Sequence, residues 1–288
     1  KIKKLEFCDN FDQPLSVGFI PSSVEILKFG KNFNQSILPN VLPNSLKELE
    51  FGDKFNNFIN KENLPSSLET LIFGKDFSLL ILEGLPDSIT RLEFSDNYNQ
   101  IIYEEFLPKS IKILNIGNFC DSSIPHTVKK LKLGNEFNQP IQENYLPENL
   151  EILVFGDNFN QFINEEYLPK SLISLTFGRD FNQIISVKQL PSLTTLIFDF
   201  NQDIEQFTLP NNLKYLKFGD NFNSLINRDA IPKSLKTLKF GKSFNQQLNF
   251  LQIDRRLEVL KFGDNFNRKI EFKLPNTIKK LTFGKNYN

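Results

Sequence analysis

Cysteine is scarce in this chain of 288 residues, which has two, Cys8 and Cys120, far apart in the sequence. Two cysteines cannot make a disulfide framework, and proteins without one are typical of a reducing compartment. A single glycosylation sequon, Asn34-Gln35-Ser36, lies on a repeated position where a glycan would not fit. We therefore expect a cytoplasmic protein.

Histidine is scarcer still, because His126 is the only one and follows Pro125 at a variable position. No Cys–His spacing of a metal site is present. The glycines are spread singly along the chain, so they form no phosphate-binding loop. The carboxylates are scattered as well. These absences predict a protein that is not an enzyme and has no cofactor and no metal site.

Net charge and long apolar runs are also missing. The chain has 34 basic and 34 acidic residues, so its total charge gives no reason to expect nucleic acid. No apolar run is long enough to span a membrane, and no basic-then-apolar segment of a signal peptide opens the chain. The charge is uneven, however: residues 209–288 carry 16 basic and 6 acidic side chains, and residues 1–208 carry 18 and 28.

What the sequence does contain is a repeat. The stretch LKFGDNFN occurs at 216–223 and again at 260–267, 44 residues later. Both copies fit a looser pattern, L-P-x-S-L-x-x-L-x-F-G-x-x-F-N-x-x-I, that recurs with a spacing of 22 residues in most coils. A period of this length indicates a solenoid. It runs from end to end, so we expect one domain over residues 1–288, with a partial repeat at each end.

Each repeated position has a structural interpretation. Two columns, the F of F-G and the F of F-N, hold 24 of the 31 phenylalanines. Stacked aromatic rings would form a continuous core. Alternation in the L-x-F segment, with Leu49 and Phe51 inward and Glu48 and Glu50 outward, predicts a half-buried strand. The glycine that follows suits a turn, and the proline of L-P suits a segment outside the ladder.

The asparagine of F-N forms a third column. We expect these amides to be buried and therefore hydrogen-bonded to turn backbone groups of their own and adjacent coils. Asp12, Ser78 and Cys120 replace asparagine in three coils, which favours a structural role for Cys120. The column consists of Asn34, Asn56, Asn99, Asn138, Asn160, Asn182, Asn201, Asn223, Asn245 and Asn267.

The period limits what a coil can hold. Twenty-two residues cannot contain a strand, two turns and a long helix, so the return should be extended, 3₁₀ or a short strand-like turn. We expect about fourteen coils, with a parallel sheet on one face and few or no α-helices. Two coils are irregular: 107–123 is five residues short and 190–208 is three short. The coil geometry should change at both.

The segment LPNSLKELEFGDKFNNFI at 42–59 and its sister segments resemble FNIP repeats, a variant of the leucine-rich repeat. The resemblance covers essentially the whole chain. Such repeats are typical of social amoebae and giant DNA viruses, so the chain would act in the host cytoplasm if it is viral. The resemblance implies a leucine-rich-repeat solenoid with a role in protein–protein interaction.

The outward positions of the strands are free of core packing and would carry specificity. In the middle of the chain they form an expected apolar patch, and exposed patches of this kind often mark interaction sites. A column of lysines adjoins the patch and would attract an acidic protein surface, or else pair locally with Asp220, Glu258 and Asp264. No aromatic interleaving supports nucleic-acid binding. The candidate protein-binding residues are Ile152, Val154, Ser174, Thr176, Thr195, Ile197, Tyr215, Lys217, Lys239 and Lys261.

An alternative function is a structural rod that associates end to end. The sequence opens and stops inside a repeat, which would leave an unpaired strand at each end. Lysines near both ends, such as Lys4 and Lys280, oppose strand pairing. We therefore expect a monomer or a weak dimer that binds a protein partner.

Overall fold

The computed structural model describes residues 1–117, 124–184, 186–205, 208–227, 230–248, 256–271 and 273–288, and the backbone of Phe119 and Cys120. The coil opening expected at Ile253-Asp254 and the side chain of Cys120 lie outside the described part. The chain divides into two compact units, Lys1–Phe137 and Asn138–Asn288, which we describe in turn. The expectation of one domain stays a prediction.

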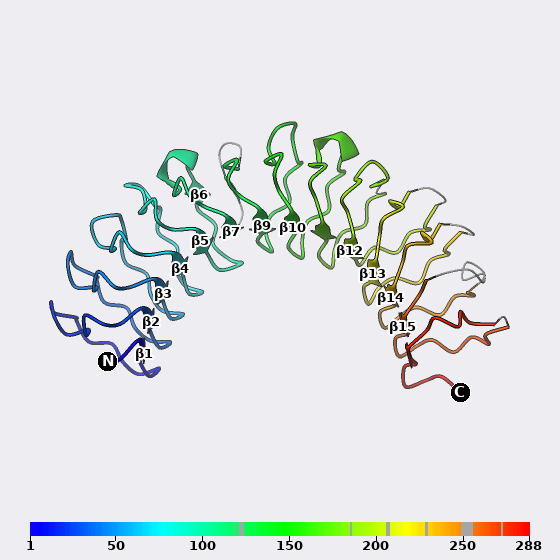
Figure 1. The fold of residues 1–288 in the computed structure, drawn as a ribbon, viewed down its shortest axis with the longest axis horizontal. Helices are drawn as coiled ribbons and strands as arrows, with labels where there is room; N and C mark the ends of the chain where they lie inside the picture. The colour runs from blue at the N-terminus through cyan, green and yellow to red at the C-terminus, as the bar shows by residue number, and fades with distance from the viewer. Residues whose placement is uncertain are drawn as a thin grey trace. The chain divides into compact units, whose positions relative to one another are not determined.

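The first unit contains a parallel sheet in which each strand pairs with the strand of the next coil (Figure 1). Equivalent repeat positions are in register, so Leu5 pairs with Leu27 and Leu27 with Leu49. A second ladder joins β6 (Ile101–Ile102) to β8 (Phe119–Cys120), next to the 3₁₀ turn η1 (Glu104–Phe106). The sheet strands are β1 (Lys4–Glu6), β2 (Ile26–Lys28), β3 (Glu48–Glu50), β4 (Thr70–Ile72), β5 (Arg91–Glu93), β7 (Ile113–Ile116) and β9 (Lys130–Leu133).

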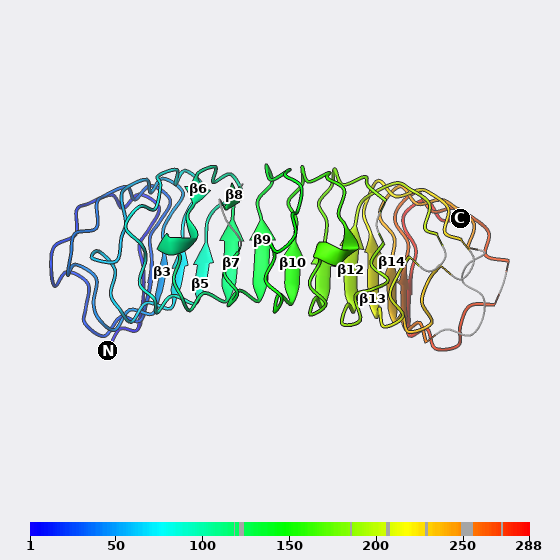
Figure 2. The ribbon, with the colours of Figure 1, turned by 90° about the horizontal axis from the view of Figure 1, so that it is seen from above.

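The second unit repeats this plan, with strands side by side in chain order (Figure 2). Its return segments include the 3₁₀ turn η2 (Glu165–Tyr167) and an isolated bridge between Ile204 and Ile226. The strands are β10 (Ile152–Val154), β11 (Ser174–Thr176), β12 (Thr195–Phe198), β13 (Tyr215–Phe218), β14 (Thr237–Lys239), β15 (Val259–Lys261) and β16 (Lys280–Thr282). The parallel strands of successive coils confirm the expected solenoid, and no α-helix occurs in the described ranges.

The core of each coil lies between its strand and its return segment. In β3, Leu49 is fully buried while Glu48 is exposed and Glu50 half-buried, which confirms the alternation predicted for this strand. Phe51 stacks on Phe55 of its own coil, with 3.7 Å between ring centroids. It also stacks on Phe29 and Phe73 of the neighbouring coils, at 5.6 and 5.8 Å. The aromatic columns are thus continuous across these coils.

The glycine after the strand is needed for close approach between coils. A Cβ placed on Gly52 would lie 1.9 Å from the carbonyl oxygen of Gly30, much closer than atoms can pack. The backbones of adjacent turns therefore approach to a distance that any side chain at this position would prevent.

In the coil at 107–123 the sequence has one residue between the glycine and the aromatic residue that follow strand β7, where regular coils have two. In regular coils a turn N–H donates to the preceding coil, as Asn32 does to the carbonyl oxygen of Asp9 at 3.0 Å. After the short coil, the N–H of Asn135 donates instead to Asp96, two coils back, at 3.2 Å. The Lys132 ammonium reaches the carboxylate of Asp96 at 2.6 Å. The coil after the short one thus contacts the coil two places back through Asn135 and Lys132.

The aromatic rings of the coil at 190–208 are rotated relative to those of the neighbouring coils. Phe198 meets Phe218 edge to face, with 88° between ring planes, and Phe181 meets Phe200 at 69°. Regular neighbours are nearly parallel, as for Phe218 and Phe240 at 2°. One residue, Asp199, separates Phe198 from Phe200, where regular coils have three residues, and the shorter connection reorients both rings.

Candidate functional site

The candidate apolar patch lies on the outward face of β10 to β13, in the second unit. Strand pairing aligns Ile152 with Ser174, then Thr195, then Tyr215. Two residues further along each strand, Val154 aligns with Thr176 and Ile197. Every one of these side chains is half-buried. The structure therefore brings the patch residues together as neighbours on one sheet face.

The lysine column continues the row that starts at Val154. Ile197 aligns with Lys217, Lys217 with Lys239, and Lys239 with Lys261. The Lys239 ammonium lies 5.1 Å from the centre of the Tyr215 ring, a cation–π contact that the sequence reading missed. The column of six positions thus changes from apolar to basic between Ile197 and Lys217.

The expected carboxylate partners of this column are engaged elsewhere. Glu258 pairs with Lys236 at 3.2 Å and with Lys279 at 2.8 Å, and hydrogen bonds from both ammonium groups lower the pKa of its carboxyl. Asp220 accepts the backbone N–H of Lys242 at 3.0 Å. No ion pair among the described residues includes Lys217, Lys239 or Lys261. The alternative of local pairing with Asp220, Glu258 and Asp264 is therefore not observed.

The same strand positions in the first unit carry paired charges. Lys4 pairs with Glu6 at 2.8 Å, and Arg91 pairs with Glu93 at 2.7 Å. Lys28 pairs with Glu50 across β2 and β3. The repeat can therefore place opposite charges on this face, and in the described part of the second unit it places three lysines in succession instead.

The asparagine column forms a ladder of hydrogen bonds between coils. In most of the described coils the side-chain oxygen accepts the backbone N–H of the equivalent residue in the next coil, whereas that of Asn182 accepts the Gln202 side-chain amide at 3.5 Å. The distance is 2.9 Å from Asn34 to Asn56 and 2.8 Å from Asn223 to Asn245. Contrary to the expectation of burial, these side chains are exposed or half-buried, because the ladder runs along the surface of the turns.

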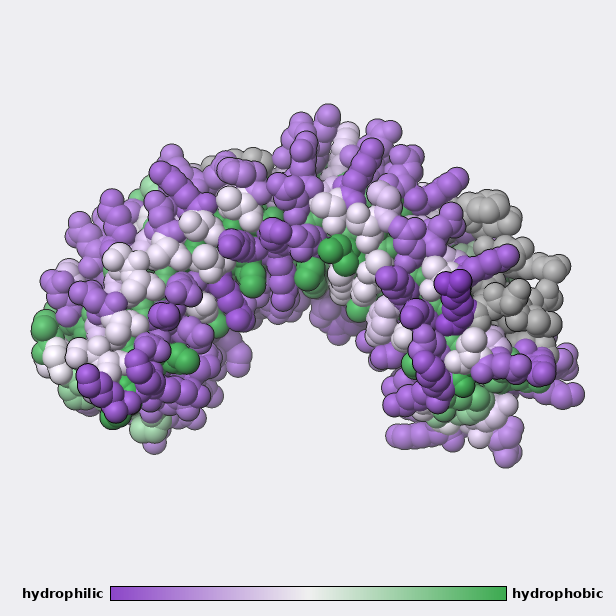
Figure 3. Space-filling model, viewed as in Figure 1, coloured by the Kyte–Doolittle hydropathy of each residue, from purple (hydrophilic) through white to green (hydrophobic). Residues whose placement is uncertain are grey.

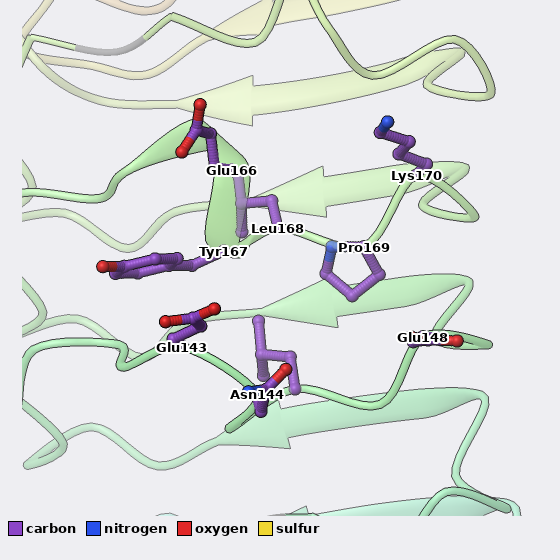
Figure 4. Close-up of a pocket in the computed structure, with 9 residues that line it drawn as sticks. Glu143, Asn144, Glu148, Glu166, Tyr167, Leu168, Pro169 and Lys170 are labelled. Atoms are coloured by element: carbon purple, nitrogen blue, oxygen red, sulfur yellow. The ribbon is translucent and has the colours of Figure 1, made fainter.

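A pocket of about 550 Å³ lies between two return segments of the second unit (Figure 4). Glu143 and Tyr167 lie on one side of it, and Glu148 and Lys170 on the other. Its lining residues include neither histidine nor cysteine. The full lining is Glu143, Asn144, Leu146, Glu148, Glu166, Tyr167, Leu168, Pro169 and Lys170.

The residues considered for chemistry in the sequence are dispersed. His126 is exposed, and Cys8 is an exposed free thiol. In the described ranges, no group of three or more His, Cys, Asp or Glu side chains could hold a metal ion. Nor does that part of the chain include a helix with the length and apolarity needed to cross a bilayer.

Exposed apolar side chains three residues after the F of F-N were missed by the sequence reading. They include Phe58, Phe162 and Ile184, at 70%, 68% and 74% exposure. The signal was available, because the same repeat position is apolar in several coils. In Figure 3 the hydrophobic areas visible on each unit are short and separated by hydrophilic side chains.

Parallel strands stacked with a period near 22 residues, a buried leucine in each strand and an asparagine ladder define a leucine-rich-repeat solenoid. The chain belongs to the FNIP repeat family. The FNIP Repeat model matches residues 1–32, 33–76, 79–119, 137–180, 159–199, 200–243, 223–265 and 244–286.

Two solved structures illustrate the similarity. CroV588, a giant-virus protein described as a novel circular LRR protein structure, is 44% identical, with a TM-score of 0.82. The match covers 98% of this chain and 43% of CroV588, so this chain spans less than half of that protein. YopM from Yersinia enterocolitica is 18% identical over 92% of this chain and 70% of its own, with a TM-score of 0.49. A search of curated proteins found no significant match.

Proposed function

We propose that this chain is a non-catalytic protein-interaction scaffold that binds a protein partner on the outward sheet face of its second unit. The observation that carries the proposal is the register of Ile152, Val154, Thr176, Thr195, Ile197 and Tyr215, which makes them one contiguous patch. Leucine-rich repeats leave these positions free of core packing. A contiguous area of low charge on a protein surface is typical of an interaction site.

The test places two charges inside the patch. The double variant Val154→Asp, Ile197→Asp should abolish binding, because docking would remove water from two carboxylates on a surface that is apolar in the wild type. Binding is measured first by pull-down from host lysate and then by titration with the purified partner. The matched control is Phe162→Asp, Ile184→Asp, which makes the same chemical change at exposed positions outside the strands. Equal binding by the wild type and the Val154→Asp, Ile197→Asp variant would refute the proposal.

Self-association of copies of this chain is the second candidate function. We favour a monomer or a weak dimer, because Lys4 in β1 and Lys280 in β16 are side chains of the kind that oppose strand pairing. Light scattering over a range of protein and salt concentrations distinguishes the two. Mass that grows without limit at low salt would favour the self-associating rod.

A further inference from the structure

We infer that the sheet face of the second unit is built for an amphipathic acidic helix, whose apolar end covers Val154, Thr176 and Ile197 and whose carboxylates meet Lys217, Lys239 and Lys261. This inference rests on the proposed function and specifies its partner. It uses the single row of six residues that the strand register aligns from β10 to β15.

No ion pair among the described residues neutralises the lysines of this row, although the charge of Lys217 acts on the Asp199 carboxyl and Lys239 lies over the Tyr215 ring. Three lysines occupy successive strands in register, and like charges on adjacent strands are mildly destabilising. The carboxylate of Glu258 does not pair with them, since it is held by Lys236 and Lys279. In the first unit, residues at the same positions pair with each other, as Lys28 does with Glu50. An acidic partner would supply the missing charges in the second unit.

The spacing of the row suits a helix better than a strand. Adjacent strands lie about 4.8 Å apart, so the two intervals between Lys217 and Lys261 cover about 9.6 Å. Residues i and i+7 of a helix are about 10.5 Å apart along its axis and lie on the same face. Same-face residues of an extended peptide are about 6.7 Å apart, so two intervals would cover about 13 Å.

The length of the row sets the size of the helix. Five strand intervals separate Val154 from Lys261, or about 24 Å. At 1.5 Å per residue, a helix of about 16 residues covers that length. Its contact face would be apolar over one half and acidic over the other, matching the change between Ile197 and Lys217.

A nucleic-acid strand fits the same surface poorly. Half of the row carries no positive charge, and in that half only the Thr176 hydroxyl could donate a hydrogen bond to a phosphate. Tyr215 could stack on a base, but Lys239 already lies over its ring. A protein helix uses both halves of the row, and a polyanion uses one.

The experiment uses the full chain and two synthetic 18-residue helical peptides as probes. Both peptides carry two leucines on one face near one end, and one peptide continues that face with glutamates at i, i+4 and i+7. The second peptide has glutamine in place of each glutamate. An 18-nucleotide oligothymidylate is the third probe. Affinities are measured by fluorescence anisotropy at 50 and 500 mM salt.

We expect the glutamate peptide to bind about tenfold more tightly than the glutamine peptide at 50 mM salt, as three exposed ion pairs allow. The difference should vanish at 500 mM salt, where exposed charges are screened. It should change sign in Lys217→Glu, Lys239→Glu, Lys261→Glu, because the glutamates of the peptide would then face carboxylates. It should persist in Lys233→Glu, Lys242→Glu, Lys285→Glu, which changes the net charge equally outside the sheet strands.

Several outcomes would overturn the inference. Equal affinity of the two peptides for the wild type would show that the lysine row does not bind the glutamates. In that case, lower affinity of both peptides for the variant Val154→Asp, Ile197→Asp would still support the proposed sheet-face function. Unchanged affinity for this variant would contradict both the proposed function and the inference of an acidic helix. Absence of binding by either peptide rejects the helix. Tighter binding of oligothymidylate than of the glutamate peptide, lost in the triple lysine variant, would assign the row to nucleic acid.

Discussion

The side-chain oxygen of Asn160 lies 2.9 Å from the backbone nitrogen of Asn182, the equivalent residue of the next coil. It also accepts the Gln183 side-chain amide at 3.0 Å. The amide of Asn160 thus satisfies a turn N–H that no strand ladder reaches. At the same position of an earlier coil, Asp12 accepts the N–H of Asn34 at 2.9 Å, so a carboxylate performs the same role.

Two replacements of Asn160 should therefore distinguish the contribution of its hydrogen bond to stability from the contribution of its side-chain volume. We expect Asn160→Ala to lower the free energy of unfolding by about 1–2 kcal/mol, because the Asn182 N–H loses its partner. Asn160→Asp keeps the acceptor and should retain most of the stability at neutral pH. Urea unfolding measures both. A loss in Asn160→Asp as large as in Asn160→Ala would show that the oxygen is not the important group.

The carboxyl of Asp199 should give the stability of the fold an unusual dependence on pH. Burial raises its pKa above the ordinary value of 3.8, although the N–H of Asn221 donates to it at 2.7 Å. Its protonated form is thus favoured in the folded state, and its contribution to stability is lost as pH rises through the raised pKa. Asp199→Asn should raise the melting temperature at pH 7 and leave it unchanged near pH 3. The gain should be below about 1 kcal/mol, since the group is partly solvated.

Asp12 supplies the control of opposite sign. Hydrogen bonds from the Asn34 backbone and the Gln35 side chain lower the pKa of its carboxyl. Its contribution is present above the ordinary value of 3.8 and is lost as pH falls through the lowered pKa. Asp12→Asn should thus have a lower melting temperature than the wild type, with the largest difference at neutral pH and the smallest in strong acid. A parallel pH profile for the two variants would contradict both assignments.

Two phenylalanines of one coil, three residues apart, test the aromatic core. Phe159 is fully buried and stacks on Phe155 at 4.0 Å, whereas Phe162 is 68% exposed. Phe159→Ala should cost about 3–5 kcal/mol through lost burial and the remaining cavity. Phe162→Ala should change stability by less than about 0.5 kcal/mol. Chemical denaturation of both variants gives the comparison, and similar losses would mean that the column is not the main source of stability.

Close approach of adjacent turns can be tested at Gly52. A methyl group there would meet the Gly30 carbonyl, so Gly52→Ala should cost about 3 kcal/mol. Gly18→Ala is the control, because a Cβ at Gly18 would meet nothing within 4 Å and only the positive φ of 82° disfavours it. That variant should lose about 1 kcal/mol. Thermal unfolding that ranks Gly18→Ala below Gly52→Ala in stability would refute the packing argument.

The sequence by itself determined the repeat, the strand positions and the inward columns. Alternation at Leu49 and Phe51 follows from the two-residue period of a strand, and the coil period then aligns each strand with the next. The neighbourhood of Val154 and Ile197 was predictable for the same reason. These features depend on local geometry repeated many times, so a single chain reveals them.

Only the tertiary structure decided how the side chains of neighbouring coils pair. The exposure of the asparagine ladder, the bond from Asn135 to Asp96 across a shortened coil and the pairing of Glu258 with Lys236 and Lys279 were not predicted. Each depends on turn paths and rotamers set by contacts between residues at least 20 positions apart. A repeat pattern predicts which positions face outward, but the geometry between coils determines which partner each outward group reaches. In this chain that geometry leaves Lys217, Lys239 and Lys261 without an ion pair among the described residues.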